Sequence, residues 1–234
     1  MFRLKNDYLR DFVSLFYPPY CYICGQMLVK NEKIICTRCA LHLPYTDFHT
    51  YTPNPMEKLF WGRVSFESAI ALFYFRKGGG VQTLIHQLKY KGHREIGVEL
   101  GRILGLKMAV HPVLSTVDLL VPVPLHPKRR RSRGYNQSEA IAEGIASVLH
   151  KPVRVNALRR VIANATQTKR SLYERWENVS HIFSLGKADG LENCHLLLVD
   201  DVLTTGATVE AAAQVLCVLP GVRLSVVTLA FDLV

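Results

Sequence analysis

The stretch Leu196-Leu-Leu-Val-Asp-Asp-Val-Leu-Thr-Thr-Gly-Ala-Thr208 decides the fold of this chain. It opens with four apolar residues that end at Val199, a run short enough to predict a fully buried strand rather than a helix. Two carboxylates, Asp200 and Asp201, follow where this strand is expected to end, and a hydroxyl-rich turn around Gly206 leads into an alanine-rich helix. Ligands of open α/β sheets bind beyond the carboxyl ends of the strands, so we expect a binding site at this turn.

The residues after the two aspartates have the composition of a phosphate-binding turn. The start of a helix offers free N–H groups to an anion, and a glycine allows close approach. This candidate phosphate loop consists of Thr204, Thr205, Gly206, Ala207 and Thr208. Because Asp200 and Asp201 would repel a phosphate, they fit sugar hydroxyls or the waters of a Mg²⁺ ion. The pattern therefore predicts a ribose phosphate bound with a metal, and the simpler alternative is that the aspartates only cap the helix.

Two common nucleotide-binding motifs are missing from the sequence. It contains neither Gly-x-x-x-x-Gly-Lys-Ser/Thr nor Gly-x-Gly-x-x-Gly after a predicted strand. Both motifs work by wrapping a glycine-rich backbone around phosphates. ATP hydrolysis through a P-loop and dinucleotide binding are therefore disfavoured.

Composition limits the class of protein. A chain of 234 residues can hold one good-sized core and a small appendage. No apolar run approaches the roughly 20 residues of a membrane-spanning helix. Residues 1–16 carry scattered charges unlike a signal peptide, and their apolar residues recur at helical spacing, so we expect a short amphipathic helix and a cytoplasmic location. The net charge of +10 fits an anionic partner, either a phosphorylated metabolite or a nucleic acid.

Four cysteines near the N-terminus have metal-binding spacing. Cys21 and Cys24 form one Cys-x-x-Cys pair, and Cys36 and Cys39 form a second. Two such pairs supply the four thiolates of a closed tetrahedral site, which is typical of structural Zn²⁺. A disulfide pair is disfavoured without a secretory signal, and a redox Cys-x-x-Cys usually occurs singly.

The cysteines and a proline-containing stretch near residue 53 suggest how the chain is divided. We expect an N-terminal helix and Cys₄ zinc module over residues 1–50, a linker over 51–65 and an α/β domain over 66–234.

A second predicted strand, Leu119–Val123, is ended by prolines, because proline cannot donate to a sheet ladder. Leu125 and His126 follow, and then a basic loop that consists of Lys128, Arg129, Arg130, Arg131 and Arg133. Three interpretations remain open for this loop: a solvated charge run, a nucleic-acid patch or a pyrophosphate cradle of bidentate arginines. A loop at the carboxyl end of a second strand would face the same crevice as the aspartates, which favours the pyrophosphate interpretation.

Several motifs occur together in an order that resembles a known family. These are the leading Cys₄ arrangement, Val121-Pro-Val-Pro-Leu-His-Pro, Arg-Gly-Tyr-Asn-Gln at 133–137, and Val-Asp-Asp-Val-Leu-Thr-Thr-Gly-Ala-Thr. The last motif resembles the PRPP-binding loop of type I phosphoribosyltransferases (PRPP is phosphoribosyl pyrophosphate). The whole set resembles the ComF family of competence-associated proteins, the ComFC and GntX group, over nearly the whole chain. Tyr135 departs from the family, which more often has phenylalanine there.

The resemblance implies a zinc-finger module followed by a phosphoribosyltransferase-like parallel sheet with flanking helices, and a role in DNA uptake. It further implies that Asp200 and Asp201 contact the PRPP ribose, that Mg²⁺ accompanies PRPP, and that the phosphate loop holds the 5-phosphate. Leu125 and His126 would approach the pyrophosphate. The polar segment 164–178 resembles the family's mobile active-site loop, in which Lys169 and Arg170 would neutralise the departing diphosphate as catalytic residues.

The function expected is that of a PRPP-binding phosphoribosyltransferase-like protein in DNA uptake, with single-stranded DNA or DNA-uptake and recombination proteins as partners. Two alternatives remain. One is a metabolic phosphoribosyltransferase with an unknown nitrogen acceptor, and the other is a nucleic-acid-binding module with a vestigial PRPP site. Expected strands are 69–75, 119–123, a short one near 153, 196–199 and 224–229. Expected helices are 81–91, 95–110, 138–150 and 208–218.

Overall fold

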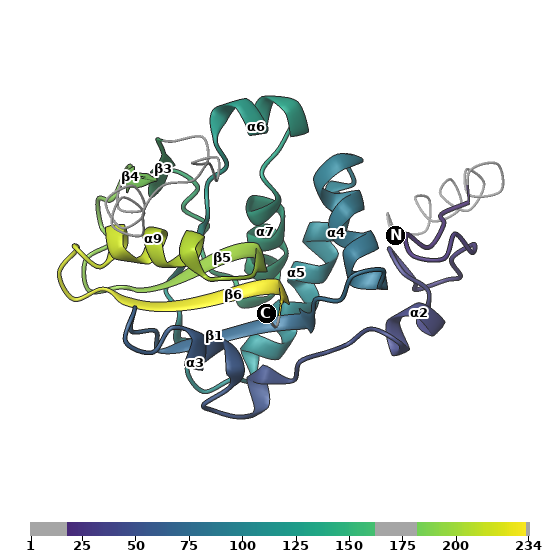
Figure 1. The fold of residues 1–234 in the computed structure, drawn as a ribbon, viewed down its shortest axis with the longest axis horizontal. Helices are drawn as coiled ribbons and strands as arrows, with labels where there is room; N and C mark the ends of the chain where they lie inside the picture. Colours follow the sequence, from purple (N-terminus) through teal and green to yellow (C-terminus); the bar gives the residue numbers. More distant parts are fainter. Residues whose placement is uncertain (1–17, 162–181, 233–234) are drawn as a thin grey trace, which may run out of the picture.

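A computed structural model describes residues 18–161 and 182–232 of the chain. Its main sheet has four strands in the order β1-β6-β5-β2, and every neighbouring pair runs parallel. Helix α9 lies on one face of this sheet, and α5 and α7 lie on the other (Figure 1). The expected α/β class with a parallel sheet and flanking helices is confirmed.

The elements have the following bounds. The strands are β1 (Ser68–Tyr74), β2 (Leu119–Pro122), β3 (Leu158–Arg160), β4 (Phe183–Leu185), β5 (His195–Leu203) and β6 (Arg223–Phe231). The helices are α2 (Thr37–Leu41), α3 (Pro55–Leu59), α4 (Gly80–Tyr90), α5 (Arg94–Ala109), α6 (Pro127–Arg133), α7 (Gln137–Leu149) and α9 (Ala207–Leu216). Two short 3₁₀ turns occupy Phe48–Thr50 and Leu114–Thr116. Among these helices, none combines the length and the hydropathy that a membrane crossing requires.

Strand β5 is longer than the sequence predicts. Residues 196–199 are fully buried between β6 and β2, as an apolar run in a central parallel strand should be. Pairing with β6 continues past Val199, because Asp200 lies opposite Thr228 and Leu203 lies opposite Phe231. Asp200 and Asp201 therefore belong to the strand and do not follow it, which corrects the expected strand end.

Helices α5 and α7 make an unusually close contact. A Cβ added to Gly144 would lie 2.0 Å from the carbonyl oxygen of Val98, and one added to Gly101 would lie 2.2 Å from that of Ile141. Only glycine allows two backbones to approach this closely. The contact fixes α7 against the sheet, with its N-terminal end beside the aspartates of β5.

Residues 51–65, expected as a linker, are packed. Asn54 caps α3 and also donates from its side-chain amide to the carbonyl oxygen of Ala69 in β1, at 2.9 Å. Met56 and Phe60 are fully buried. Because this segment contributes to the core, it does not act as an extended connector between two parts of the chain.

Two further elements differ from expectation. The basic loop contains helix α6, with His126 as N-cap, Pro127 in the first turn and Gly134 in the left-handed conformation at the end. The short strand expected near Val153 is only one parallel bridge to Leu120. The antiparallel pair β3–β4 forms a small second sheet that the sequence did not predict. The amphipathic helix expected over residues 1–16 lies outside the described residues.

The cysteine-containing segment packs against α4 and α5. The Tyr22 hydroxyl donates to the Glu95 carboxylate, and Lys33 forms a 2.8 Å ion pair with Glu99. Gly80, the first residue of α4, fits closely against the Ile23 and Leu43 side chains. The two parts of the chain are therefore in direct contact.

Candidate functional site

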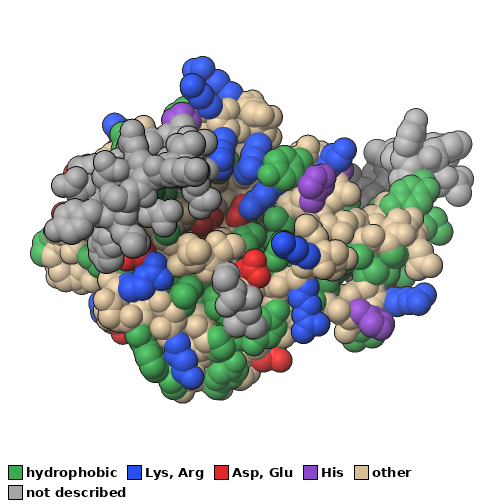
Figure 2. Space-filling model, viewed as in Figure 1, with side chains coloured by type: hydrophobic (Ala, Val, Ile, Leu, Met, Phe, Trp, Pro, Cys, Tyr) green, Lys and Arg blue, Asp and Glu red, His purple; other side chains and the backbone are tan. Residues whose placement is uncertain are grey.

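The candidate site lies where β5 ends beside the last turn of α4 and the first turn of α7. Asp200 accepts a 3.1 Å hydrogen bond from the Ser138 hydroxyl and a 2.8 Å bond from the backbone N–H of Asp201. Ser138 is buried, because Asn136 caps α7 and turns its first residues toward the sheet. Figure 2 shows acidic side chains at the floor of a recess, bordered by lysine and arginine side chains.

A lysine from α4 neutralises part of this acidic pair. Lys89 Nζ lies 2.9 Å from Asp201 Oδ1, and both side chains are largely shielded from solvent. Burial, and next the charge of Asp201, raise the pKa of Asp200 from 3.8 to about 7, although Lys89 and Ser138 oppose the change. Asp200 is therefore partly protonated at neutral pH. A cation that binds here would favour the ionised form of Asp200 and displace its proton.

The phosphate loop has its hydrogen-bonding groups available. Gly206 caps α9 with φ +80°, so the first N–H groups of the helix point beyond its start. Thr204 and Thr205 are exposed. Within the described residues, no side-chain hydroxyl of Thr204, Thr205 or Thr208 has a partner. The loop therefore offers both backbone and hydroxyl donors to an anion.

Gly206 is expected to tolerate no side chain. A Cβ there would lie 2.9 Å from Phe60 Cε1, in addition to the strain of a positive φ. We expect Gly206→Ala to lower the free energy of unfolding by about 2–3 kcal/mol, measured by urea denaturation. Gly62→Ala is the matched control, because Gly62 has φ +72° with nothing within 4 Å of its added Cβ. Equal losses in the two variants would exclude the contact with Phe60 as a cause.

Arg63 supports the phosphate loop, and the sequence analysis missed it. It donates to Glu210 in the first turn of α9, at 3.0 Å from Nε, and to the Thr205 carbonyl oxygen at 3.0 Å. Glu210 by itself would repel an anion at the start of α9. Its pairing with Arg63 removes much of this repulsion. No local signal predicts this pair, whose members are 147 residues apart.

Two of the five cations of helix α6 form hydrogen bonds with other side chains of the protein. Arg130 forms a bidentate pair with Glu139, at 3.0 and 3.1 Å, and Arg133 donates to the Gln137 side chain at 2.9 Å. Lys128, Arg129 and Arg131 have no ion pair within the described residues. Pro127 after the His126 cap and Gly134 at the end are a helix signature that the sequence already contained.

Arg160 is a second residue that the sequence analysis missed. It comes from β3, and its guanidinium lies 5.3 Å from the centre of the Phe183 ring. Burial lowers its pKa, the charge of Arg129 adds to this effect, and the charge of Asp200 opposes it. Arg160 is therefore close enough to interact electrostatically with both the basic helix and the acidic pair. Lys169 and Arg170, expected as catalytic residues, lie outside the described residues.

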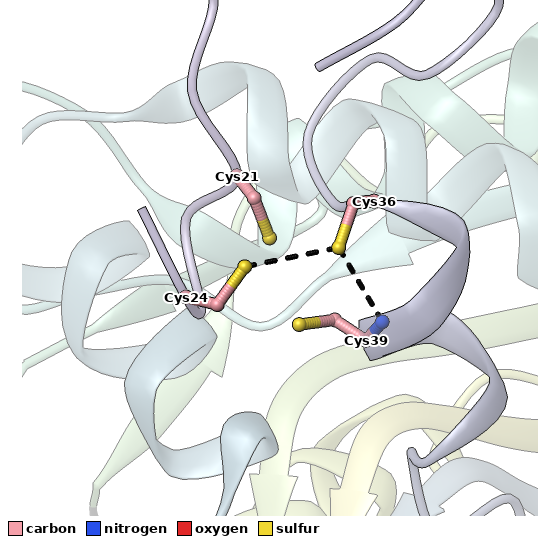
Figure 3. A group of neighbouring side chains, drawn as sticks. All are labelled: Cys21, Cys24, Cys36 and Cys39. Carbon is pink, nitrogen blue, oxygen red and sulfur yellow. Dashed lines mark hydrogen bonds between the residues drawn. The ribbon is translucent and has the colours of Figure 1, made fainter. Parts of the chain in front are cut away.

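The four cysteines come together as a second candidate site (Figure 3). The sulfurs of Cys21, Cys24, Cys36 and Cys39 all lie within 4.8 Å of one another, which suits one bound metal ion. Burial opposes ionisation of Cys21, but hydrogen bonds from the backbone of Cys24 and Cys36 lower its pKa to about 6. Thiolates are the form that binds metals. The cysteine spacing therefore predicted a real cluster.

Comparison with known proteins identifies relatives but no family model that matches. The chain is 32% identical over 201 residues to the DNA utilization protein YhgH of Escherichia coli K12, covering 84% of this chain and 83% of that protein. It is 37% identical over 210 residues to YhgH of Salmonella typhimurium, covering 85% and 91%. It is 35% identical over 213 residues to competence protein ComFC of Bacillus subtilis, covering 84% and 77%.

Solved structures resemble the chain more distantly. One is the allosteric regulatory enzyme of purine biosynthesis, with a TM-score of 0.41 and 18% identity over 60% of this chain and 29% of that one. Another is the glutamine PRPP amidotransferase of Bacillus subtilis, with a TM-score of 0.40 and 18% identity over 60% and 30%.

Proposed function

Because this chain belongs to the ComF family, which includes the YhgH and ComFC proteins, we propose that it binds PRPP and acts in the handling of DNA. One observation supports the PRPP proposal most directly. The paired aspartates of β5 stand beside Lys89 and Ser138, three residues before a phosphate loop whose donors have no partner within the described residues.

Each part of PRPP has residues of matching chemistry. Carboxylate oxygens of Asp200 and Asp201 would accept hydrogen bonds from the ribose hydroxyls. The phosphate loop would donate backbone N–H groups and hydroxyls to the 5-phosphate. Leu125 and His126, between β2 and α6, would approach the diphosphate.

The acidic pair also fits Mg²⁺, which prefers oxygen ligands and keeps several waters. When bound with PRPP, Mg²⁺ would neutralise charge on the diphosphate. Phosphoribosyl transfer passes through a cation-like sugar as the diphosphate leaves, so positioning and charge stabilisation dominate its catalysis. Lys169 and Arg170 are the residues proposed to add positive charge as the diphosphate departs.

The cysteine cluster fits a structural zinc ion. Tetrahedral Zn–S bonds of about 2.3 Å require sulfur–sulfur edges of about 3.8 Å. The Cys24 and Cys36 sulfurs are 3.8 Å apart. Four thiolates leave no open coordination position, so this ion would stabilise the module and take no part in transfer.

The names of the relatives support the DNA part of the proposal. They are called DNA utilization proteins or competence proteins. Single-stranded DNA and DNA-uptake or recombination proteins are therefore the proposed partners, in the cytoplasm. A nucleic-acid-binding module with an inactive donor site is a second candidate, favoured by the Lys89–Asp201 ion pair, which fills the position of a cation. A metabolic phosphoribosyltransferase with a nitrogen acceptor has no separate support.

Calorimetric titration tests the proposal. We expect heat when PRPP with Mg²⁺ is added to the full chain, and much weaker binding of ribose 5-phosphate, which lacks the diphosphate. Absence of heat with PRPP would overturn the donor-site proposal and favour the inactive-site candidate. Release of pyrophosphate in the presence of ammonia or a panel of bases then separates an enzyme from a protein that only binds PRPP.

A further inference from the structure

A basic groove runs between the end of α4 and helix α6. It has a volume of about 590 Å³. Its walls contain Lys89, Tyr90 and Lys91 from the end of α4, and Arg129 and Arg133 from α6. These elements are about 40 residues apart in the sequence and meet only in the folded chain. Four cations and no carboxylate line the groove, so it favours a polyanion.

Much of this positive charge is uncompensated. Within the described residues, Lys91 and Arg129 have no ion pair or hydrogen bond from their side chains. Arg133 is held in place by Gln137, and it stacks over the Tyr90 ring at 5.1 Å. An ordered arginine beside two cations without ion pairs is well suited to bind a chain of phosphates.

Tyr90 adds a flat surface to the groove. The residue is 63% exposed, so its ring is accessible from the groove. The His86 ring lies 5.1 Å from it on the same helix. Aromatic rings in a cationic groove are typical of proteins that bind single-stranded nucleic acids, because an unpaired base can stack on the ring. The bases of a duplex are already stacked on one another, so a duplex would gain less from contact with the Tyr90 ring.

Lys89 connects this groove to the candidate PRPP site. It lines the groove, and its ammonium group forms the 2.9 Å ion pair with Asp201. A cation or a ribose hydroxyl at Asp201 would compete with this ammonium group for the same oxygen. Once released, Lys89 has no other carboxylate partner within the described residues, so its charge becomes available to the groove.

We propose that this groove binds the phosphodiester backbone of single-stranded DNA, with a base on Tyr90, and that PRPP strengthens this binding by releasing Lys89 from Asp201. The coupling between the two sites rests on the proposed binding of PRPP. The assignment of the groove as the DNA site does not depend on PRPP binding. Because coupling between sites is reciprocal, DNA would strengthen PRPP binding by the same factor.

The groove can be tested without PRPP. Binding of a fluorescent oligo-thymidine to the full chain is measured by anisotropy at several salt concentrations. We expect the Tyr90→Ala, Lys91→Gln double variant to bind about tenfold more weakly and with a smaller salt slope. Lys58→Gln, an exposed lysine on α3, is the charge-matched control and should bind like the natural chain. Unchanged binding by a folded double variant would overturn the groove as the DNA site.

The coupling is tested by repeating the titration with saturating PRPP and Mg²⁺. We expect affinity for the oligonucleotide to rise about fivefold in the natural chain and to stay constant in Lys89→Gln. Competition between PRPP and the oligonucleotide would assign the groove to the diphosphate and overturn the proposal. If calorimetry shows that PRPP does not bind, the proposed function and the coupling both fail. The titration without PRPP would still test whether the groove binds DNA.

Discussion

Asp200→Asn is expected to make the protein more stable and to weaken strongly its binding of PRPP with Mg²⁺. In the free protein, burial and the charge of Asp201 raise the pKa of Asp200 to about 7, so ionisation of Asp200 is unfavourable in the folded state. Asparagine keeps the oxygen that accepts hydrogen bonds from Ser138 and Asp201 but never becomes charged. The variant therefore loses the repulsion between the two carboxylates. It also loses the negative charge that a bound cation requires.

The effect of pH has a definite sign. Between pH 4 and 7, Asp200 is ionised in the unfolded chain and still protonated in the folded one. The unfolded state then binds fewer protons, so stability contributed by this group falls as pH rises through this window and levels off above pH 7. Because Asp200 keeps partial access to solvent, which screens its interactions, we expect the natural chain to lose on the order of 1–2 kcal/mol across the window.

Thermal unfolding and calorimetry check both halves of this prediction. At pH 8 the melting temperature of Asp200→Asn should exceed that of the natural chain by a few degrees, since 1 kcal/mol corresponds to about 2–4 °C in a domain of this size. Affinity for PRPP with Mg²⁺ should fall at least about a hundredfold, and further in the Asp200→Asn, Asp201→Asn double variant. Asp189→Asn, at an exposed position, should change neither quantity. A destabilised variant that still binds PRPP would contradict the assigned role of Asp200.

Loss of metal from the cysteine cluster is expected to unfold the N-terminal module. The four cysteines hold two knuckles together, and the Cys36 sulfur also caps helix α2 by accepting from the Cys39 backbone N–H. Buried apolar side chains around the cluster are few, namely Cys21, Leu28 and Cys36. Structural zinc contributes about 10–16 kcal/mol of apparent binding energy in zinc-finger peptides, far more than so small a core can supply.

Metal analysis combined with unfolding measures this effect. The natural chain should contain one zinc ion, and Cys36→Ser or a strong chelator should remove it and lower the melting temperature by more than about 10 °C. The contact with α5 through Tyr22 and Glu95 should then be lost. Cys217→Ser is the matched control, because Cys217 is exposed and lies outside the cluster. Equal metal content in Cys36→Ser and the control would refute the assignment.

Sequence patterns predicted the elements with strong local signals. Strands β1, β2, β5 and β6 and helices α4, α5, α7 and α9 lie within a few residues of their expected positions, because each contains an apolar run or a helical repeat. The cysteine cluster was predicted from spacing alone, since two Cys-x-x-Cys pairs permit few other arrangements. Helix α6 was not predicted, although its proline and glycine signals are present, because its sequence has no apolar repeat and no buried residue.

Other features of the structure are not indicated by any local sequence pattern. Strands β3 and β4 have three residues each and exist only because they pair with one another. The Lys89–Asp201 and Arg63–Glu210 pairs join residues more than 100 positions apart, so only the folded chain reveals them. These contacts decide the electrostatics of the candidate site. The acidic and hydroxyl groups of the site could therefore be identified from the sequence. The charge state of the acidic groups could not.

The glycine contact between α5 and α7 limits how the candidate site can change during evolution. At Gly101 and Gly144 the two backbones touch, so no larger side chain can be accepted without moving one helix. Ser138, in the first turn of α7, donates a hydrogen bond to Asp200, and any shift of this helix would misplace that hydrogen bond. A new ligand would therefore be easier to accommodate by substitutions in α6, most of whose residues are exposed, than by a change in the spacing between α7 and β5.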